Sequence, residues 1–382
     1  MKREERQGLS SLLTDSEIGS VRRDSVVLSS VACAPSAQPT IDTDAAIDAE
    51  IEATKALDRQ LLIDSRNYAG EQVLRSWWLL LSTLAVLAAV LSVAAMADML
   101  WLRLLGSLLS GLTLVRVFIV YHDYQHQALL KNSPLATAIL TIYGYVMLTP
   151  PSVWKRSHDH HHRHNSKLFG ASIGSFPIMT TDSYRVASAR DRWEYHIARS
   201  PLIILLGYLT VFLFGMCLRP LLLDPRRHWD APLSLLVHIG LIGGIAWACD
   251  WPTALLTVVL PTWVASTAGA YLFYIQHNFP SAKIRRSEEW SYTKAALKSS
   301  SYLELGPVMN WLTGNIGYHH VHHLNAKIPF YRLPEAMAGL EGLQSPGRTS
   351  LRLDDILACL RLKLWDTQLD RFVSFAEARQ SR

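Results

Sequence analysis

The sequence HDHHHRH at residues 158–164 places five histidines within seven residues. Two more histidine clusters occur, HDYQH at residues 122–126 and HHVHH at residues 319–323, and His277 stands alone after another apolar stretch. Each cluster lies at or near the end of an apolar run. Imidazole is the commonest neutral metal ligand in proteins. The three clusters therefore predict a metal centre that works at the surface of a membrane.

The spacing within the clusters fits one face of a helix. Successive helical residues are about 100° apart. His122 and His126 are four residues apart, so their side chains share one face. His158, His161 and His162 fall within a sector of about 100°. A histidine tract that stores metal or arises from biased composition has no such helical phase.

Other histidines of the clusters lie outside this sector. His160 and His164 fall at about 200° and 240° from His158. The spacing H-x-x-H-H recurs in the third cluster, with His319, His322 and His323. His320 lies just outside the sector that these three define. For the isolated histidines we expect only interfacial roles; they are His196, His228 and His238.

The apolar runs predict an all-α membrane protein. The chain has 382 residues, of which 49% are hydrophobic. Four runs are long enough or nearly long enough to cross a bilayer; they are Trp78–Ala95, Leu104–Tyr121, Leu233–Ala248 and Ala254–Ile275. The shorter runs Leu135–Leu148 and Pro201–Leu218 are expected to be interfacial or re-entrant helices. We therefore expect four transmembrane helices in two hairpins, interfacial helices, and a cytoplasmic cap that holds the metal centre.

The distribution of charge gives the expected orientation. All ligands of one site must lie on one side of the membrane, and two hairpins return the chain to the same side at His122 and at His277. Basic residues gather on that side: Arg75, Lys131, Lys155, Arg156, Arg163, Arg226, Arg227, Lys283, Arg285 and Arg286. The opposite side has Arg103. By the positive-inside rule, the histidine side is cytoplasmic.

The sequence divides into three expected parts. Residues 1–60 are polar, lack the apolar segment of a secretory signal, and predict a mostly disordered cytoplasmic leader. Residues 61–375 form the membrane domain, and residues 376–382 form a tail. We expect a multi-pass protein of the bacterial inner membrane with both termini in the cytoplasm. No pattern typical of nucleic-acid binding occurs, so the basic charge reflects topology.

The clusters and their flanking residues resemble one known family. The segments that carry the resemblance are WKRSHDHHHRHN at 154–165, NIGYHHVHHLN at 315–325, IP at 328–329 and YRLP at 331–334. They are similar to the membrane fatty acid desaturases with three histidine boxes, and most similar to the acyl-lipid branch of ω6 (Δ12) type. The resemblance covers about residues 75–375. One departure is HDYQH, where many relatives have HDCGH.

The resemblance implies a non-haem centre with two iron ions. Its implied ligands are His122, His126, His158, His161, His162, His319, His322 and His323, with His277 as a further ligand between the second and third boxes. Spacing alone leaves the metal open, because imidazole also suits zinc, copper and nickel. Ligating imidazoles need outer hydrogen-bond partners. Candidates for that role are Asp123, Asp159, Glu304 and Asn315.

The family also implies a reaction: O2-dependent desaturation of a fatty acyl lipid, which inserts a cis double bond. Metals and O2 supply the oxidant for an unactivated methylene, while the protein orients the substrate. We find no haem, flavin or iron–sulfur motif in the sequence. The electrons are therefore expected from a separate donor, a ferredoxin or a cytochrome b5-type protein.

Two other classes of function remain open from the sequence. A hydroxylase, ketolase or epoxygenase could use the same oxidant and scaffold, and the mass of the product distinguishes it from a desaturase. A metal transporter would need ionisable ligands near the middle of its spanning helices. The clusters lie beyond the apolar runs instead, which argues against transport.

Overall fold

The computed structural model describes residues 43–169 and 173–380, and most of these residues are helical. Helix α1 (Thr43–Asp64) includes residues 43–60, which the sequence led us to expect as irregular leader. This part instead contains five alanines, and alanine is the strongest helix former. Residues 1–42 of the expected leader lie outside the described residues. The chain divides into units 1–51 and 52–382, and the features below belong to the second unit.

Four helices are long and apolar enough to cross a membrane, as predicted, in the part of the chain that the structure describes. They are α2 (Val73–Met96), α3 (Leu100–Gln125), α10 (Asp230–Ala248) and the continuous stretch Trp251–His277. This stretch consists of α11 (Trp251–Ala254), the π-helix η3 (Leu255–Val259) and α12 (Leu260–His277). Each helix is longer than its apolar run, because backbone hydrogen bonding continues into residues that flank the run at one or both ends.

The four helices form two hairpins that pack against each other. Helix α2 packs along α3, and α3 packs along α12. The approach of α3 to α12 requires glycine at position 111, because a Cβ there would lie 2.5 Å from the Val264 Cβ. At the far end, Arg103 donates to the Ala94 carbonyl at 2.9 Å and to the Thr253 hydroxyl at 2.8 Å. Arg103 therefore links the turns of both hairpins.

The two shorter apolar runs form short helices, as predicted. Helix α4 (Pro134–Val146) begins with Ser133 as its N-cap and has a proline in its first turn. The second run is divided into α8 (Pro201–Leu205) and the π-helix η2 (Tyr208–Leu218), followed by α9 (Arg219–Leu223). Both runs give helices shorter than the four candidate spans, since Pro134–Val146 and the helical stretch Tyr208–Leu223 each have 10–17 residues.

Helix α5 (Pro151–His164) carries the second histidine cluster on its last two turns. Proline at the first helical position is favourable, because the N–H that it lacks would have no partner there. Asp230, at the start of α10, accepts a hydrogen bond from the Ser152 backbone N–H at 2.9 Å. This contact holds the beginning of α5 against α10. The third cluster forms the short helix α15 (His319–Leu324), which is buried throughout.

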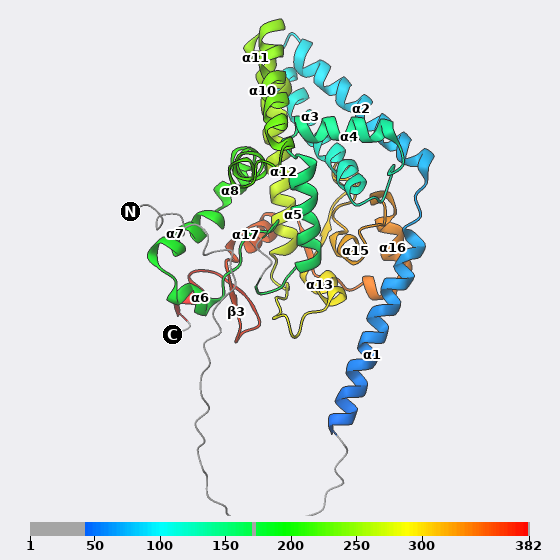
Figure 1. Ribbon diagram of the computed structural model, residues 1–382, viewed down its shortest axis with the longest axis vertical. Helices are drawn as coiled ribbons and strands as arrows, with labels where there is room; N and C mark the ends of the chain where they lie inside the picture. Colours follow the sequence, from blue (N-terminus) through cyan, green and yellow to red (C-terminus); the bar gives the residue numbers. More distant parts are fainter. Residues whose placement is uncertain (1–42, 170–172, 381–382) are drawn as a thin grey trace, which may run out of the picture. The chain divides into compact units, whose positions relative to one another are not determined.

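The remaining elements lie at the end of the spans where the histidines gather (Figure 1). The helices are η1 (Ser65–Tyr68), α6 (Thr181–Val186), α7 (Ala189–Ala198), α13 (Tyr292–Ser299), α14 (Pro307–Leu312), η4 (Phe330–Arg332), α16 (Leu333–Gly339), η5 (Glu341–Leu343), α17 (Leu353–Arg361) and α18 (Glu377–Gln380). Strand β1 (Tyr302–Glu304) pairs in parallel with β2 (Arg348–Ser350). Strand β3 (Leu364–Asp366) pairs antiparallel with β4 (Arg371–Val373). Two such short pairs do not change the predicted class, a helical membrane protein.

Candidate metal centre

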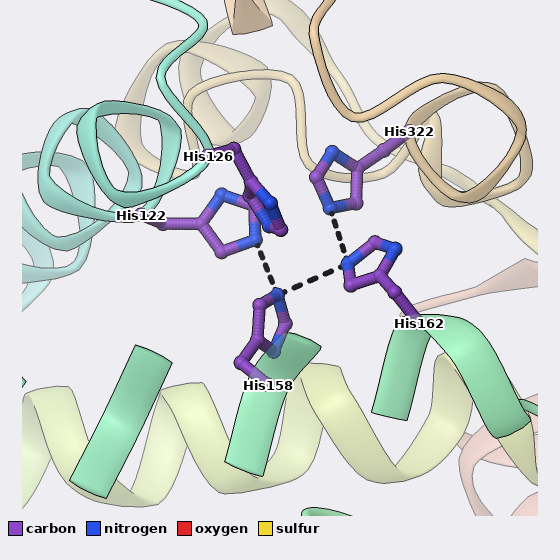
Figure 2. A group of neighbouring side chains, drawn as sticks. All are labelled: His122, His126, His158, His162 and His322. Atoms are coloured by element: carbon purple, nitrogen blue, oxygen red, sulfur yellow. Dashed lines mark hydrogen bonds between the residues drawn. The ribbon is translucent and has the colours of Figure 1, made fainter. Parts of the chain in front are cut away.

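Five histidines from three helices converge in a first group. Helix α3 supplies His122 from its last turn and His126 as its C-cap, α5 supplies His158 and His162, and α15 supplies His322. Three contacts between Nε2 atoms join four of the rings: His122 to His158 at 3.0 Å, His158 to His162 at 3.1 Å, and His162 to His322 at 3.0 Å. Figure 2 shows the five rings turned toward one another. We call this set the five-histidine group.

Four other histidines converge in a second group. His161 comes from α5, His277 from the last residue of α12, and His319 and His323 from α15. The His277 Nε2 lies 2.9 Å from the His319 Nε2 and 3.0 Å from the His161 Nε2. The His323 Nε2 lies 3.2 Å from the His161 Nε2 and 3.1 Å from the His319 Nε2. We call this set the four-histidine group.

The two groups are neighbours because α5 and α15 contribute to both. His161 and His162 are adjacent in sequence, yet His161 belongs to the four-histidine group and His162 to the five-histidine group. The rings of His162 and His323 stack across the boundary, with centroids 4.3 Å apart. The sequence-predicted ligands thus all lie in one of two abutting groups.

Burial favours the neutral form of seven of these imidazoles. It lowers the pKa of each ring well below the usual value, and the charges of neighbouring imidazoles lower the pKa further. The seven residues are His126, His158, His161, His162, His319, His322 and His323. A neutral imidazole has a free lone pair and binds metal without first losing a proton. At neutral pH the groups are therefore ready to bind cations.

Outer contacts orient three of the rings. The His122 Nδ1 lies 2.9 Å from a carboxylate oxygen of Asp123, whose other oxygen accepts from the Phe330 backbone N–H at 2.6 Å. The His277 Nδ1 donates to the Ser299 carbonyl at 3.0 Å. The His161 Nδ1 lies 2.7 Å from the Ser175 hydroxyl. Each contact occupies Nδ1 and leaves Nε2 to face the group.

Of the four predicted outer partners, the structure places Asp123 against a group histidine. Asp159 instead pairs with Lys155 at 3.0 Å. Glu304 pairs with Arg348 on the exposed edge of β1. Asn315 donates to the Phe330 carbonyl at 3.2 Å. Sequence reasoning missed the contacts from Ser175 and from the Ser299 carbonyl. Ser175 lies in a loop, Ser299 is the last residue of α13, and a backbone carbonyl leaves no signal in the sequence.

The remaining histidines lie outside both groups. The rings of His160 and His164 stack on each other with centroids 4.0 Å apart. Both lie outside the sector of the predicted ligands, as the helical phase predicted. His320 is buried and contacts the Leu343 carbonyl at 3.1 Å. His238 is also buried, with contacts to the Tyr208 hydroxyl at 2.6 Å and the Val146 carbonyl at 2.7 Å. It is therefore a packed residue rather than an interfacial one.

The donor set fits two cations. An imidazole nitrogen lies about 2.1 Å from a bound divalent ion, so two nitrogens at right angles around one ion are about 3 Å apart. The Nε2 contacts in both groups have this length. A carbonyl can only accept a hydrogen bond, so the His277 Nδ1 carries its proton and the Nε2 points a lone pair at neighbouring nitrogens. A cation bound in each group would accept the lone pairs that otherwise point at one another.

Comparison with known proteins identifies the family. The sequence model of the fatty acid desaturases matches residues 99–350, which include all three histidine clusters. A fatty acid desaturase of Bacillus subtilis is 33% identical over 263 residues, which are 69% of this chain and 74% of that protein. The chain belongs to the fatty acid desaturase family. It is an oxidoreductase, as the resemblance of the histidine boxes predicted.

Further relatives of this desaturase are named for acyl-lipid substrates. An sn-1 acyl-lipid omega-3 desaturase (ferredoxin) of Nostoc sp. is 26% identical over 246 residues, covering 61% of this chain and 66% of that protein. An sn-1 oleoyl-lipid 12-desaturase of Synechocystis sp. is 24% identical over 244 residues, with the same coverage. The names of these two relatives agree with the branch that the histidine boxes resemble. The unusual Tyr124 of the first box donates to the Thr137 hydroxyl of α4 at 2.8 Å and so anchors the end of α3.

Proposed function

We propose that this enzyme uses O2 to insert a cis double bond into the acyl chain of a membrane lipid, at two iron ions held by the nine histidines. The single observation that carries the proposal is the pair of abutting groups composed of histidine alone. The reaction balances as one –CH2–CH2– unit, O2, two electrons and two protons giving one –CH=CH– unit and two waters. When bound, the ions together with O2 supply the oxidant that removes hydrogen.

The protein holds the centre rigid and keeps it dry. We propose that the five-histidine group binds one ion and the four-histidine group binds the other. Asp123 fixes the ring of His122 and also ties it to the segment after the third box through Phe330. Trp154 stacks on His158 with ring centroids 4.5 Å apart, and Phe273 packs on His161 at 4.8 Å. These aromatic rings exclude water from the faces of two ligands.

An apolar pocket of about 70 Å³ between α3, α12 and α14 is our candidate for part of the acyl-chain path. Its lining has no charged residue: Leu112, Val115, Ala268, Tyr271, Leu272, Leu305, Met309, Leu312, Thr313 and Leu351. Half of these side chains come from α3 and α12, which carry His122 and His277 in their last turns. A chain in this pocket would therefore pack against the two helices that bring these histidines to the centre.

The orientation, domain limits and electron source are part of the proposal. We place the histidine groups and both termini in the cytoplasm of a bacterium, since the basic residues gather there. The domain limits at residues 60 and 375 remain a prediction. We favour a ferredoxin as donor, because the relative from Nostoc is named for one. A cytochrome b5-type protein is the second candidate.

Product analysis and metal analysis test the proposal. The enzyme is expressed with a ferredoxin system in a host that makes simple saturated and monounsaturated lipids, and His322→Ala serves as the inactive control. We expect a fatty acid that has lost two hydrogens, and iron in the protein purified in mild detergent. A product that has gained one oxygen would make the enzyme a hydroxylase. Stoichiometric zinc without iron in active protein would refute the metal assignment.

A further inference from the structure

A pocket of about 710 Å³, with charged side chains in its lining, opens beside the five-histidine group. Its lining comes from η1 and its neighbours, the end of α3, α5, and the ends of α13 and α15: Leu62, Arg66, Ala69, His126, Gln127, Lys155, Asp159, Tyr292, Leu324, Asn325, Ala326 and Lys327. Every one of these residues lies outside the four candidate spans. The pocket therefore faces the aqueous side and differs from the apolar pocket between the spans.

His126 joins this pocket to the five-histidine group. Of the nine histidines in the two groups, His126 alone lines the pocket. Within the described residues, its buried Nε2 has no hydrogen-bond partner. The backbone around it is held by two lysines: Lys327 donates to the His126 carbonyl at 2.6 Å, and Lys155 donates to the Gln125 carbonyl at 3.0 Å. Cations are favourable there, because the negative end of the α3 dipole lies at these carbonyls.

The pocket is positively charged. Its lining has three cations, Arg66, Lys155 and Lys327, and one carboxylate, Asp159, which pairs with Lys155. Burial lowers the pKa of Lys327, and the nearby charges of Lys155 and Lys131 lower it further, so Lys131 adds to the same positive region. Positive potential in a recess raises the encounter rate with an acidic partner.

We propose that this pocket docks an acidic protein that carries one electron at a time, and that electrons enter the five-histidine group past His126. The inference rests on the proposed function, because each double bond needs two electrons from outside the substrate. Two carriers each lose one electron for every double bond formed, and two protons from water complete the balance. The acyl chain and the electrons thus reach the centre from different sides.

The pocket suits a protein better than a lipid headgroup. The lining of this pocket shares no residue with the apolar pocket between the spans, which is our candidate for the acyl chain. The charges are also spread over four separate segments, and the potential of an acidic protein surface can complement all of them. A phosphate headgroup would instead need the cations to converge on one point.

Charge reversal at the exposed edge tests the docking site. Arg66 and Lys131 are exposed and lie outside both histidine groups, so the variant Arg66→Glu/Lys131→Glu changes charge without touching the centre. The matched control is Arg226→Glu/Arg286→Glu, in which two exposed arginines outside the pocket change by the same charge. All proteins are studied in lipid nanodiscs, both metal-free and metal-loaded.

The first measurement is binding of a plant-type [2Fe–2S] ferredoxin by surface plasmon resonance. At low ionic strength we expect the Kd of the pocket variant to rise about tenfold or more, and the difference to shrink to about twofold in high salt. The control should bind like the wild type. This readout needs no catalysis, so it separates docking from chemistry. Equal binding by the pocket variant and the wild type would overturn the proposal.

The second measurement is the rate at which the metal-loaded protein is reduced. The pocket variant should accept electrons from ferredoxin about tenfold more slowly, yet be reduced by the methyl viologen radical cation at least as fast as the wild type. A variant that raises the KM for lipid and leaves ferredoxin binding intact would identify a headgroup site and refute docking. If wild-type protein binds ferredoxin but forms no unsaturated product, the proposed function fails while the docking site stands.

Discussion

At the scale of single residues, adjacent histidines of α5 have different tasks. His161 lies 3.0 Å from the His277 Nε2 in the four-histidine group, whereas His160 stacks on His164 on another face of the helix. Helical phase predicted that His160 and His164 point away from the sector that contains His158, His161 and His162. It did not predict that His161 and His162 belong to different groups, because that division depends on how α15 and α12 pack around α5.

The first prediction concerns these residues. His161→Ala removes one of four nitrogens, so we expect it to lose the metal of the four-histidine group and at least about 100-fold in activity. His160→Ala and His164→Ala should keep full metal content, because neither ring belongs to a group. Plasma mass spectrometry of the purified variants measures the metal, and lipid analysis measures the product. Equal metal loss in all three variants would contradict the assignment.

The outer contacts show what the sequence could not specify. Asp123 was predictable because it follows His122 directly and is carried by the same helix. Glu304 and Asp159 were equally plausible from the sequence, but Asp159 pairs with Lys155 one turn earlier on α5, and tertiary packing pairs Glu304 with Arg348. The Ser299 carbonyl that orients His277 was not predictable, because any residue has a carbonyl and only the fold decides which one meets a ring.

At the scale of elements, the packing of α3 on α12 sets the separation of the two groups. Both helices carry a group histidine in their last turn, His122 on α3 and His277 on α12. Four apolar runs predicted the four helices, because length and hydropathy are local properties. The contact between α3 and α12 is not local. It depends on Gly111, at which a Cβ would lie 2.5 Å from Val264 and 2.9 Å from the Pro261 carbonyl.

The second prediction tests this contact. Gly111→Ala should separate the helices, lower stability by about 1–3 kcal/mol, and reduce metal content, because overpacking moves the backbone. Gly240→Ala is the matched control, since a Cβ there meets nothing within 4 Å. In the control we expect no loss, because alanine favours helix over glycine. Thermal unfolding in detergent and metal analysis follow both variants. Unchanged stability and metal content in Gly111→Ala would show that the contact is not needed.

At the scale of the whole molecule, helix α15, which carries three group histidines, lies at one end of the spans, and the turn between α10 and α11 lies at the other (Figure 1). The sequence predicted this arrangement because ligands of one centre must meet. From the charge distribution we expect the histidine end to face the cytoplasm. Cys249 precedes the far turn and is exposed, while Cys217 and Cys359 are buried. The chain therefore carries its own topological reporter.

The third prediction uses this reporter. In intact bacterial cells that express the Cys33→Ser variant, an impermeant maleimide should label Cys249 from outside, because the far turn is expected to face the periplasm. With Cys249 also replaced by serine, a cysteine introduced at the exposed position Arg286 should stay unlabelled until the membrane is permeabilised. Arg286 follows α12 on the histidine side, so its protection reports the side of the metal centre. The opposite result would be labelling of position 286 in the second variant and no labelling of Cys249 in the first. That result would invert the topology and place the basic pocket beyond the reach of a cytoplasmic electron donor.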